Sequence, residues 1–142
     1  MDFFKNFSDS AVTDEIALDV NNDKFEVLDE ITTFIEQLKK DTVEEGKVEY
    51  FTVCKAEQIW YTIIDDFGYN IPVPIVSLGF EGEILFTFQK DEDYLEIEVC
   101  KDKYILFFEN RVTDEREFNE SFLPEQLFEH AEKYLTYLTS FK

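Results

Sequence analysis

The spacing of hydrophobic residues along the chain first changes close to Asn70. Before this point, apolar residues recur every three or four positions, which is the spacing of one face of an amphipathic helix. The first stretch contains Val27, Ile31, Phe34, Ile35 and Leu38, and the second contains Ala56, Ile59, Trp60, Ile63, Ile64 and Phe67. We therefore predict two helices in the first half of the chain, with Trp60 in the core.

After Asn70 the pattern is that of β-strands. Apolar and polar residues alternate over residues 83–89 and 94–100, and an apolar run follows at 104–108. Short connections between such segments predict an antiparallel meander. Pro72 and Pro74 restrict the segment before the meander to extended backbone at a sheet edge.

The last segment has the pattern of a helix again. Pro124 suits the first turn of a helix. The apolar stripe that follows consists of Leu127, Ala131, Tyr134, Leu135 and Leu138. The chain is thus predicted to have the α+β class in the order α-α-β-β-β-α, with helices packed on one face of a three- to four-stranded sheet. We predict a partly ordered N-terminal arm over residues 1–20 and one acidic domain over 21–142.

Composition and charge narrow the classes of function. The chain has 142 residues, of which 44% are hydrophobic, and this excludes a disordered tail. Its 33 acidic and 13 basic residues give a net charge of −20, spread along the whole sequence. This charge argues against direct binding to nucleic acid or to an anionic membrane. Without a secretory signal or a long apolar segment, we expect a cytoplasmic protein with reduced thiols at Cys54 and Cys100.

Few residues in this sequence could carry catalysis or hold a metal. The histidines and cysteines are His130, Cys54 and Cys100, whereas a structural zinc site needs four ligands. No nucleophile elbow and no glycine-rich phosphate loop is present. We therefore expect no cofactor, no metal and no enzymatic activity. One alternative is an ordinary soluble protein whose charge only maintains solubility. Another is a carboxylate-based hydrolase, because Glu96 and Glu98 share a strand face at roughly 6.6 Å of backbone rise.

The negative charge favours a function in protein binding. We predict a non-enzymatic module that occupies a basic surface of a partner, such as a toxin or a nucleic-acid-binding protein, and acts as an inhibitor, antitoxin, immunity protein or nucleic-acid mimic. The candidate binding residues are Asp91, Glu92, Asp93, Glu96, Glu98, Asp114, Glu115 and Glu117. A mimic would need these carboxylates on one face, since the average surface offers about 380 Å² per charge against roughly 110 Å² on DNA.

Part of the chain resembles a known bacterial pattern. Residues 55–64, 73–75, 81–88 and 94–99 are similar to an uncharacterised family of small α+β proteins with a Glu-Gly-Glu-Ile hairpin. The resemblance covers about residues 55–110, and this chain has Phe where the pattern has Trp. It implies the register of a hairpin and no established activity.

A further alternative is an acidic adaptor protein, because the chain shares general features with a class of chaperones. The size, the low isoelectric point and the mixed helices and strands resemble type III secretion chaperones, which are acidic α+β dimers. This resemblance implies an acidic adaptor, and it leaves a homodimer open. The order of elements differs from that of the chaperones.

Overall fold

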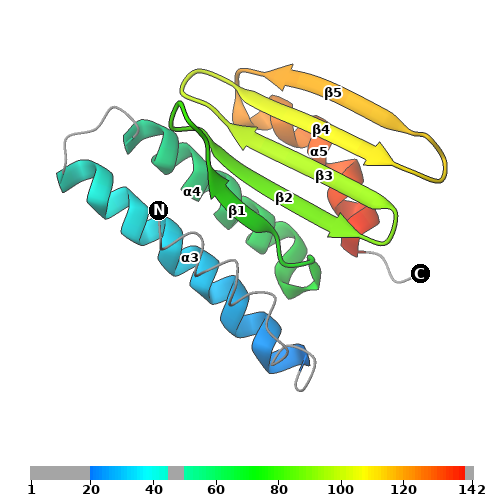
Figure 1. Cartoon of the computed structure of the whole chain (residues 1–142), viewed down its shortest axis with the longest axis horizontal. Helices are drawn as coiled ribbons and strands as arrows, with labels where there is room; N and C mark the ends of the chain where they lie inside the picture. The colour runs from blue at the N-terminus through cyan, green and yellow to red at the C-terminus, as the bar shows by residue number, and fades with distance from the viewer. Residues whose placement is uncertain (1–19, 45–49, 140–142) are drawn as a thin grey trace.

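A computed structural model of the chain describes residues 20–44 and 50–139 (Figure 1). The elements are α3 (Val20–Glu44), α4 (Tyr50–Phe67), a short 3-10 turn η1 (Gly68–Asn70), β1 (Ile75–Leu78), β2 (Ile84–Lys90), β3 (Asp93–Val99), β4 (Tyr104–Asn110), β5 (Arg116–Ser121) and α5 (Pro124–Thr139). The predicted α+β class is confirmed, with five strands where three to four were predicted. Residues 1–19 of the predicted N-terminal arm lie outside the described residues, and Val20 is the first residue of α3.

The five strands form one antiparallel meander in the order β1-β2-β3-β4-β5. Three of the short turns between the strands contain a residue in the left-handed backbone conformation. These residues are Gly82 before β2 (φ 84°), Asp91 before β3 (φ 54°) and Asp114 before β5 (φ 62°). Glycine adopts this conformation freely, and aspartate tolerates it better than most residues. β1 follows directly after Pro74 and lies at an edge of the sheet, as predicted from the prolines.

β5 is the strand that the hydrophobic pattern did not reveal. Its residues Glu117, Asn119 and Ser121 pair with the buried residues of β4 and therefore face the helices. All three are polar, so this segment lacks the apolar alternation by which a half-buried strand is recognised. Its contacts with β4 and α5 define the strand instead.

The helices all lie on one face of the sheet (Figure 1). α4 and α5 contact the strands, and α3 packs against α4. Trp60 of α4 is fully buried, stacks on Phe86 of β2 at 6.0 Å, and donates an indole N–H bond of 2.8 Å to Thr32 Oγ1 of α3. The predicted core position of Trp60 is confirmed. On α5, Tyr134 stacks on Phe108 of β4 with ring centres 4.0 Å apart.

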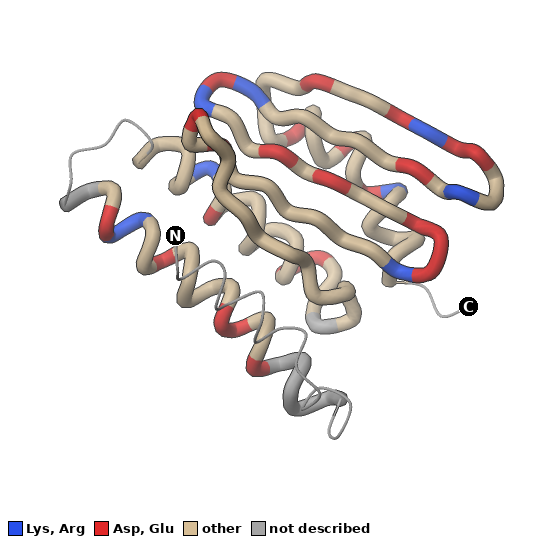
Figure 2. The backbone as a smooth tube through the Cα atoms, in the orientation of Figure 1, with Lys and Arg blue, Asp and Glu red and all other residues tan. Residues whose placement is uncertain are grey.

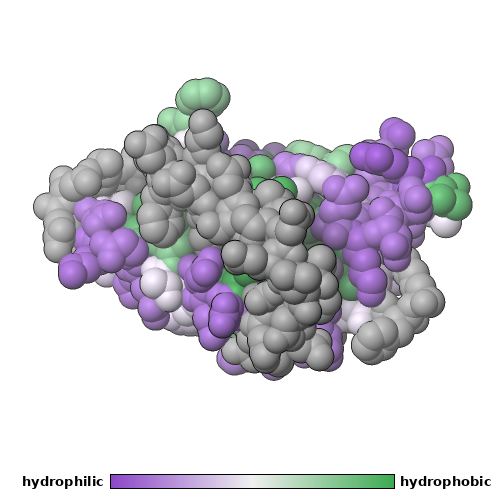
Figure 3. All heavy atoms as spheres, turned by 60° about the horizontal axis from the view of Figure 1, so that its bottom comes forward, coloured by the Kyte–Doolittle hydropathy of each residue, from purple (hydrophilic) through white to green (hydrophobic). Residues whose placement is uncertain are grey.

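The outer surface near the helices is mostly polar. Hydrophilic side chains make up most of the coloured surface in Figure 3, with smaller hydrophobic areas between them. The amphipathic stripes on the helices account for this arrangement, because their apolar residues are turned toward the core. Among the described residues, no helix is long and apolar enough to cross a bilayer.

Candidate partner-binding surface

The face of the sheet that is turned away from the three described helices carries a mixture of apolar and acidic side chains. Buried and half-buried positions alternate along β2, β3 and β4, and the buried set packs against the helices. We call the other set the open face. It consists of Ile75, Ser77, Leu85, Thr87, Gln89, Tyr94, Glu96, Glu98, Ile105, Phe107, Glu109, Arg116, Phe118 and Glu120.

The strand register places Glu98 between two apolar neighbours and Glu96 between Thr87 of β2 and an aromatic residue of β4. Glu96 pairs with Phe107 of β4, which in turn pairs with Phe118 of β5. Glu98 pairs with Leu85 on one side and with Ile105 on the other. Neighbouring strands lie about 4.8 Å apart, so these side chains form two continuous rows across the sheet.

The environment of Glu96 is partly dehydrated. The hydroxyl of Tyr94, two residues earlier on the same face, donates a hydrogen bond of 2.6 Å to Glu96 Oε2. Burial and this bond raise the pKa of Tyr94 to about 12. The tyrosine therefore stays protonated at neutral pH, and its hydroxyl orients the carboxylate of Glu96.

Glu98 lies in surroundings that disfavour its negative charge. Partial burial raises its pKa, and the nearby carboxylates of Glu83 and Glu96 raise it further. The cation of Lys103 acts in the opposite direction, but its closest ion pair is with Glu120 at 3.5 Å. A cation placed over Glu96 and Glu98 by a partner would relieve this repulsion.

The predicted acidic residues Asp91, Glu92 and Asp93 lie at the turn between β2 and β3. The side chains of Asp91 and Glu92 are exposed. Asp93 is buried, and its Oδ1 accepts a hydrogen bond of 2.7 Å from the side-chain amide of Asn110. Asp93 thus holds the start of β3 against the end of β4 and offers no carboxylate to a partner.

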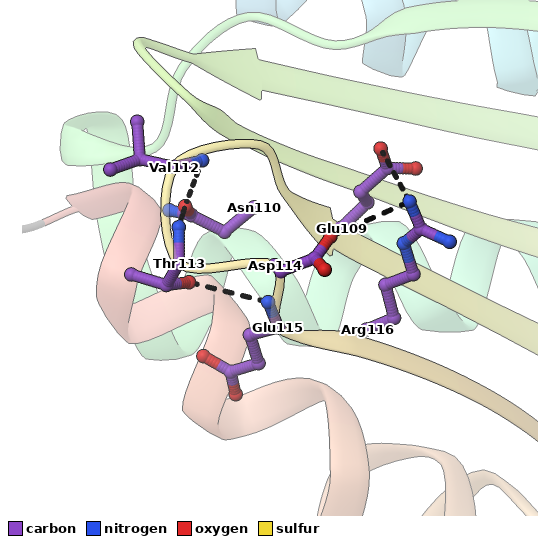
Figure 4. Close-up of polar contacts among 7 residues, drawn as sticks. All are labelled: Glu109, Asn110, Val112, Thr113, Asp114, Glu115 and Arg116. Atoms are coloured by element: carbon purple, nitrogen blue, oxygen red, sulfur yellow. Dashed lines mark hydrogen bonds and ion pairs between the residues drawn. The ribbon is translucent and has the colours of Figure 1, made fainter.

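The predicted residue Asp114 lies in the turn between β4 and β5, and this turn is at the same end of the sheet as the turn between β2 and β3 (Figure 1). The side-chain oxygen of Asn110 accepts hydrogen bonds from the backbone amides of Val112 and Thr113, which shapes this turn (Figure 4). Asp114 is exposed and lies 3.6 Å from the guanidinium of Arg116.

Glu115 and Glu117 are bound to α5. Glu115 forms an ion pair of 3.0 Å with Lys133, and Glu117 lies 2.9 Å from Nδ1 of His130. Glu117 also accepts a hydrogen bond from the hydroxyl of Tyr134, and burial together with this bond raises the pKa of the tyrosine. These contacts fasten the edge strand β5 to the helix beneath it.

The structure therefore divides the eight predicted residues among three places. Glu96 and Glu98 lie on the open face. Asp91, Glu92 and Asp114 lie in the turns at one end of the sheet, while Asp93 is buried and Glu115 and Glu117 are paired with residues of α5. Acidic residues also occur on the helices (Figure 2), so charge alone does not single out one surface.

The apolar residues of the open face were missing from the prediction. Six of them accompany the carboxylates, namely Ile75, Leu85, Tyr94, Ile105, Phe107 and Phe118. A signal for them is present in the apolar run Tyr104–Phe108, because a strand that is apolar on both faces needs a second contact surface. An apolar surface interrupted by polar groups is typical of protein interfaces.

Other chemistry is sparse in the described part of the chain. No three of its His, Cys, Asp or Glu side chains are grouped so that they could hold a metal ion. Cys54 and Cys100 are free thiols and are half-buried. Burial and the carboxylates of Glu98 and Glu83 raise the pKa of Cys100 to about 11, so it is not an activated nucleophile at neutral pH.

Comparison of the chain with family models, with curated proteins and with solved structures finds no match.

Proposed function

We propose that this protein is a non-enzymatic, acidic binding module that uses the open face to occupy a basic surface of a partner protein. The observation that carries the proposal is the placement of Glu96 and Glu98 at the centre of the sheet, each beside apolar side chains of β4. A cytoplasmic location accompanies the proposal, because the two free thiols stay reduced there.

The mixture of groups specifies the chemistry of the partner. Lysine and arginine have an apolar stem and a cationic end, so one side chain can pack on Phe107 and still reach Glu96. Such contacts neutralise carboxylates that repel one another in the free protein. Association should then be fast and should weaken as salt is added.

The apolar rows also bear on the type of module. An inhibitor, antitoxin or immunity protein that covers a mixed basic and apolar surface fits these rows. A nucleic-acid mimic would instead present closely spaced charges, because a nucleic-acid backbone has no apolar side chains between its phosphates. Phe107 and Ile105, which lie beside the carboxylates of Glu96 and Glu98, favour the first group.

A capture experiment with two matched variants tests the proposal. The protein is immobilised, exposed to lysate from its own cells, and eluted with a salt gradient. The variant Glu96→Gln/Glu98→Gln removes two charges from the open face. Glu125→Gln/Glu129→Gln removes two charges from exposed positions of α5 and serves as the control, because the net charge changes equally.

We expect a protein that is captured by the wild type and by the control, is lost with the open-face variant, and elutes at moderate salt. Capture that is equal for all three proteins, or lost equally with both variants, would contradict the proposal. The first result would place the contact elsewhere, and the second would show that only total charge matters.

A further inference from the structure

The outer edge of β5 leaves backbone groups without a neighbouring strand in the described part of the chain. The amide of Asn110 donates to the carbonyl of Glu115 at 2.9 Å, which identifies this pair as a hydrogen-bonded one. Hydrogen-bonded and non-hydrogen-bonded pairs alternate along an antiparallel ladder. Glu117 and Asn119 therefore bond to β4, and the N–H and C=O groups of the alternate residues point outward. These alternate residues are Arg116, Phe118 and Glu120.

We propose that this edge pairs with β5 of a second copy of the chain, in an antiparallel arrangement with a two-fold axis at Phe118. This pairing places Phe118 opposite Phe118 of the other copy. It also places Arg116 opposite Glu120 on both sides of the axis. The outward amides and carbonyls of the three residues then bond across the edge, and the two sheets become one.

Charge complementarity selects this register. A shift of one residue would pair outward-pointing backbone groups with groups already bonded to β4. A shift of two residues would place Arg116 opposite Phe118 or opposite Phe122. Only the pairing centred on Phe118 sets the arginine against the glutamate while the open faces of both copies stay on one side.

Both charged side chains are available for this contact. Within one copy, Arg116 lies 3.6 Å from Asp114 and 4.0 Å from Glu109, and Glu120 lies 3.5 Å from Lys103. These ion pairs are long, and the side chains of Arg116 and Glu120 are 64% and 44% exposed. Exposed ion pairs contribute little to folding stability, so exchanging them for an ion pair between the two copies costs little free energy.

Exposed apolar side chains gather at the same edge. Phe118 is 65% exposed, and Val112, in the turn before β5, is 75% exposed. Phe122 and Leu123 follow β5 and are 66% and 54% exposed. In an antiparallel pair, the start of one β5 meets the end of the other, which brings Val112 of each copy toward Phe122 and Leu123 of its neighbour.

The test uses two single variants with opposite charge changes. Arg116→Glu places glutamates opposite each other in the paired edge, and Glu120→Arg places arginines opposite each other. Each variant alone should dissociate at least about tenfold more readily than the wild type, because like charges directly opposite destabilise a strand pair. An equal mixture of the two variants restores both Arg–Glu pairs and should recover the dimer.

Sedimentation velocity over a wide range of concentration measures the association. Salt near physiological strength is needed because each copy carries a net charge of −20, and the Debye length is then about 8 Å. Lys101→Glu, an exposed change in the turn between β3 and β4, is the control with the same charge difference as Arg116→Glu and should leave the dimer intact. A monomeric wild type, or a mixture that does not associate better than its components, would overturn the inference.

Discussion

The ammonium group of Lys55, in α4, donates a hydrogen bond of 2.7 Å to the backbone carbonyl of Cys100, in the turn after β3. It donates a second bond of 3.2 Å to the carbonyl of Lys101, and it lies over the ring of Tyr104 at 4.6 Å from its centre. Burial lowers the pKa of Lys55. This one side chain ties the helical layer to the strand that carries Glu96 and Glu98.

Replacing Lys55 by Met should destabilise the protein by about 1–2 kcal/mol, because a charge-assisted hydrogen bond is lost and a half-buried carbonyl is left without its donor. Urea unfolding followed by circular dichroism measures the change. Lys101→Met, which removes an exposed ammonium nearby, should shift stability by less than about 0.5 kcal/mol. Equal effects of the two variants would show that the Lys55 bonds contribute nothing specific.

The buried carboxylate of Asp93 provides a second prediction. Asp93, at the start of β3, accepts a hydrogen bond from the side-chain amide of Asn110. Asp93→Ala removes this acceptor and should lower the free energy of unfolding by about 1–3 kcal/mol. Glu92→Ala, at the exposed position before it, should be nearly neutral. Thermal unfolding of the two variants compares them, and a neutral Asp93→Ala variant would contradict the structural role assigned to this residue.

Glu98→Gln should make the protein more stable at neutral pH. The raised pKa of Glu98 means that the folded chain holds this proton to higher pH than the unfolded chain, so ionising Glu98 costs stability as the pH rises above the normal value. The variant escapes this cost, and cross-strand charge effects suggest a gain of about 0.2–1 kcal/mol.

Urea midpoints measured at a series of pH values check this prediction. The advantage of Glu98→Gln should be present at pH 7 and should disappear as the pH falls toward about 4.3, the ordinary pKa of glutamate. Glu129→Gln, on the exposed side of α5, makes the same charge change away from the open face and serves as the control. The same Glu98 change should weaken partner binding, so greater stability and lower affinity are expected together.

Alkaline pH should destabilise the protein, because two of its tyrosines have a raised pKa in the folded state. Burial raises the pKa of Tyr94 to about 12, and a hydrogen bond to Glu36 raises that of Tyr61 to about 12. Since an unperturbed tyrosine titrates near pH 10, their contribution to stability is complete below about pH 10 and is lost as the pH rises through about 12. The denaturant concentration at the midpoint of unfolding should therefore fall as the pH is raised from about 10 to about 12, and the absorbance of tyrosinate should rise on unfolding.

Tyr94→Phe isolates one of these groups. The variant cannot lose a proton at this position, so its stability should decline less steeply with pH over the same range than that of the wild type. A slope that is unchanged by the substitution would show that the Tyr94 hydroxyl titrates equally in the folded and unfolded chain.

Local patterns in the sequence were sufficient to predict most of the helices and strands. The spacing around Ile31 and Ile59 predicted two helices, and the alternation around Ile84 and Ile97 predicted the meander, because a helix or strand with one buried face repeats its apolar residues with its own period. The prolines before Ile75 placed β1 at an edge for the same kind of local reason: a proline cannot donate to a strand ladder.

The strand β5 and the partners of the acidic residues could be known only from the tertiary structure. β5 has polar residues facing the helix, and Glu117 is satisfied there by His130 and Tyr134, which are distant in sequence. The burial of Asp93 depends on Asn110 in the next strand. Charge counts identified acidic candidates along the chain, but only strand pairing could show which carboxylates share a face with Phe107 and which are already bonded, because pairing brings together residues that sequence spacing keeps apart.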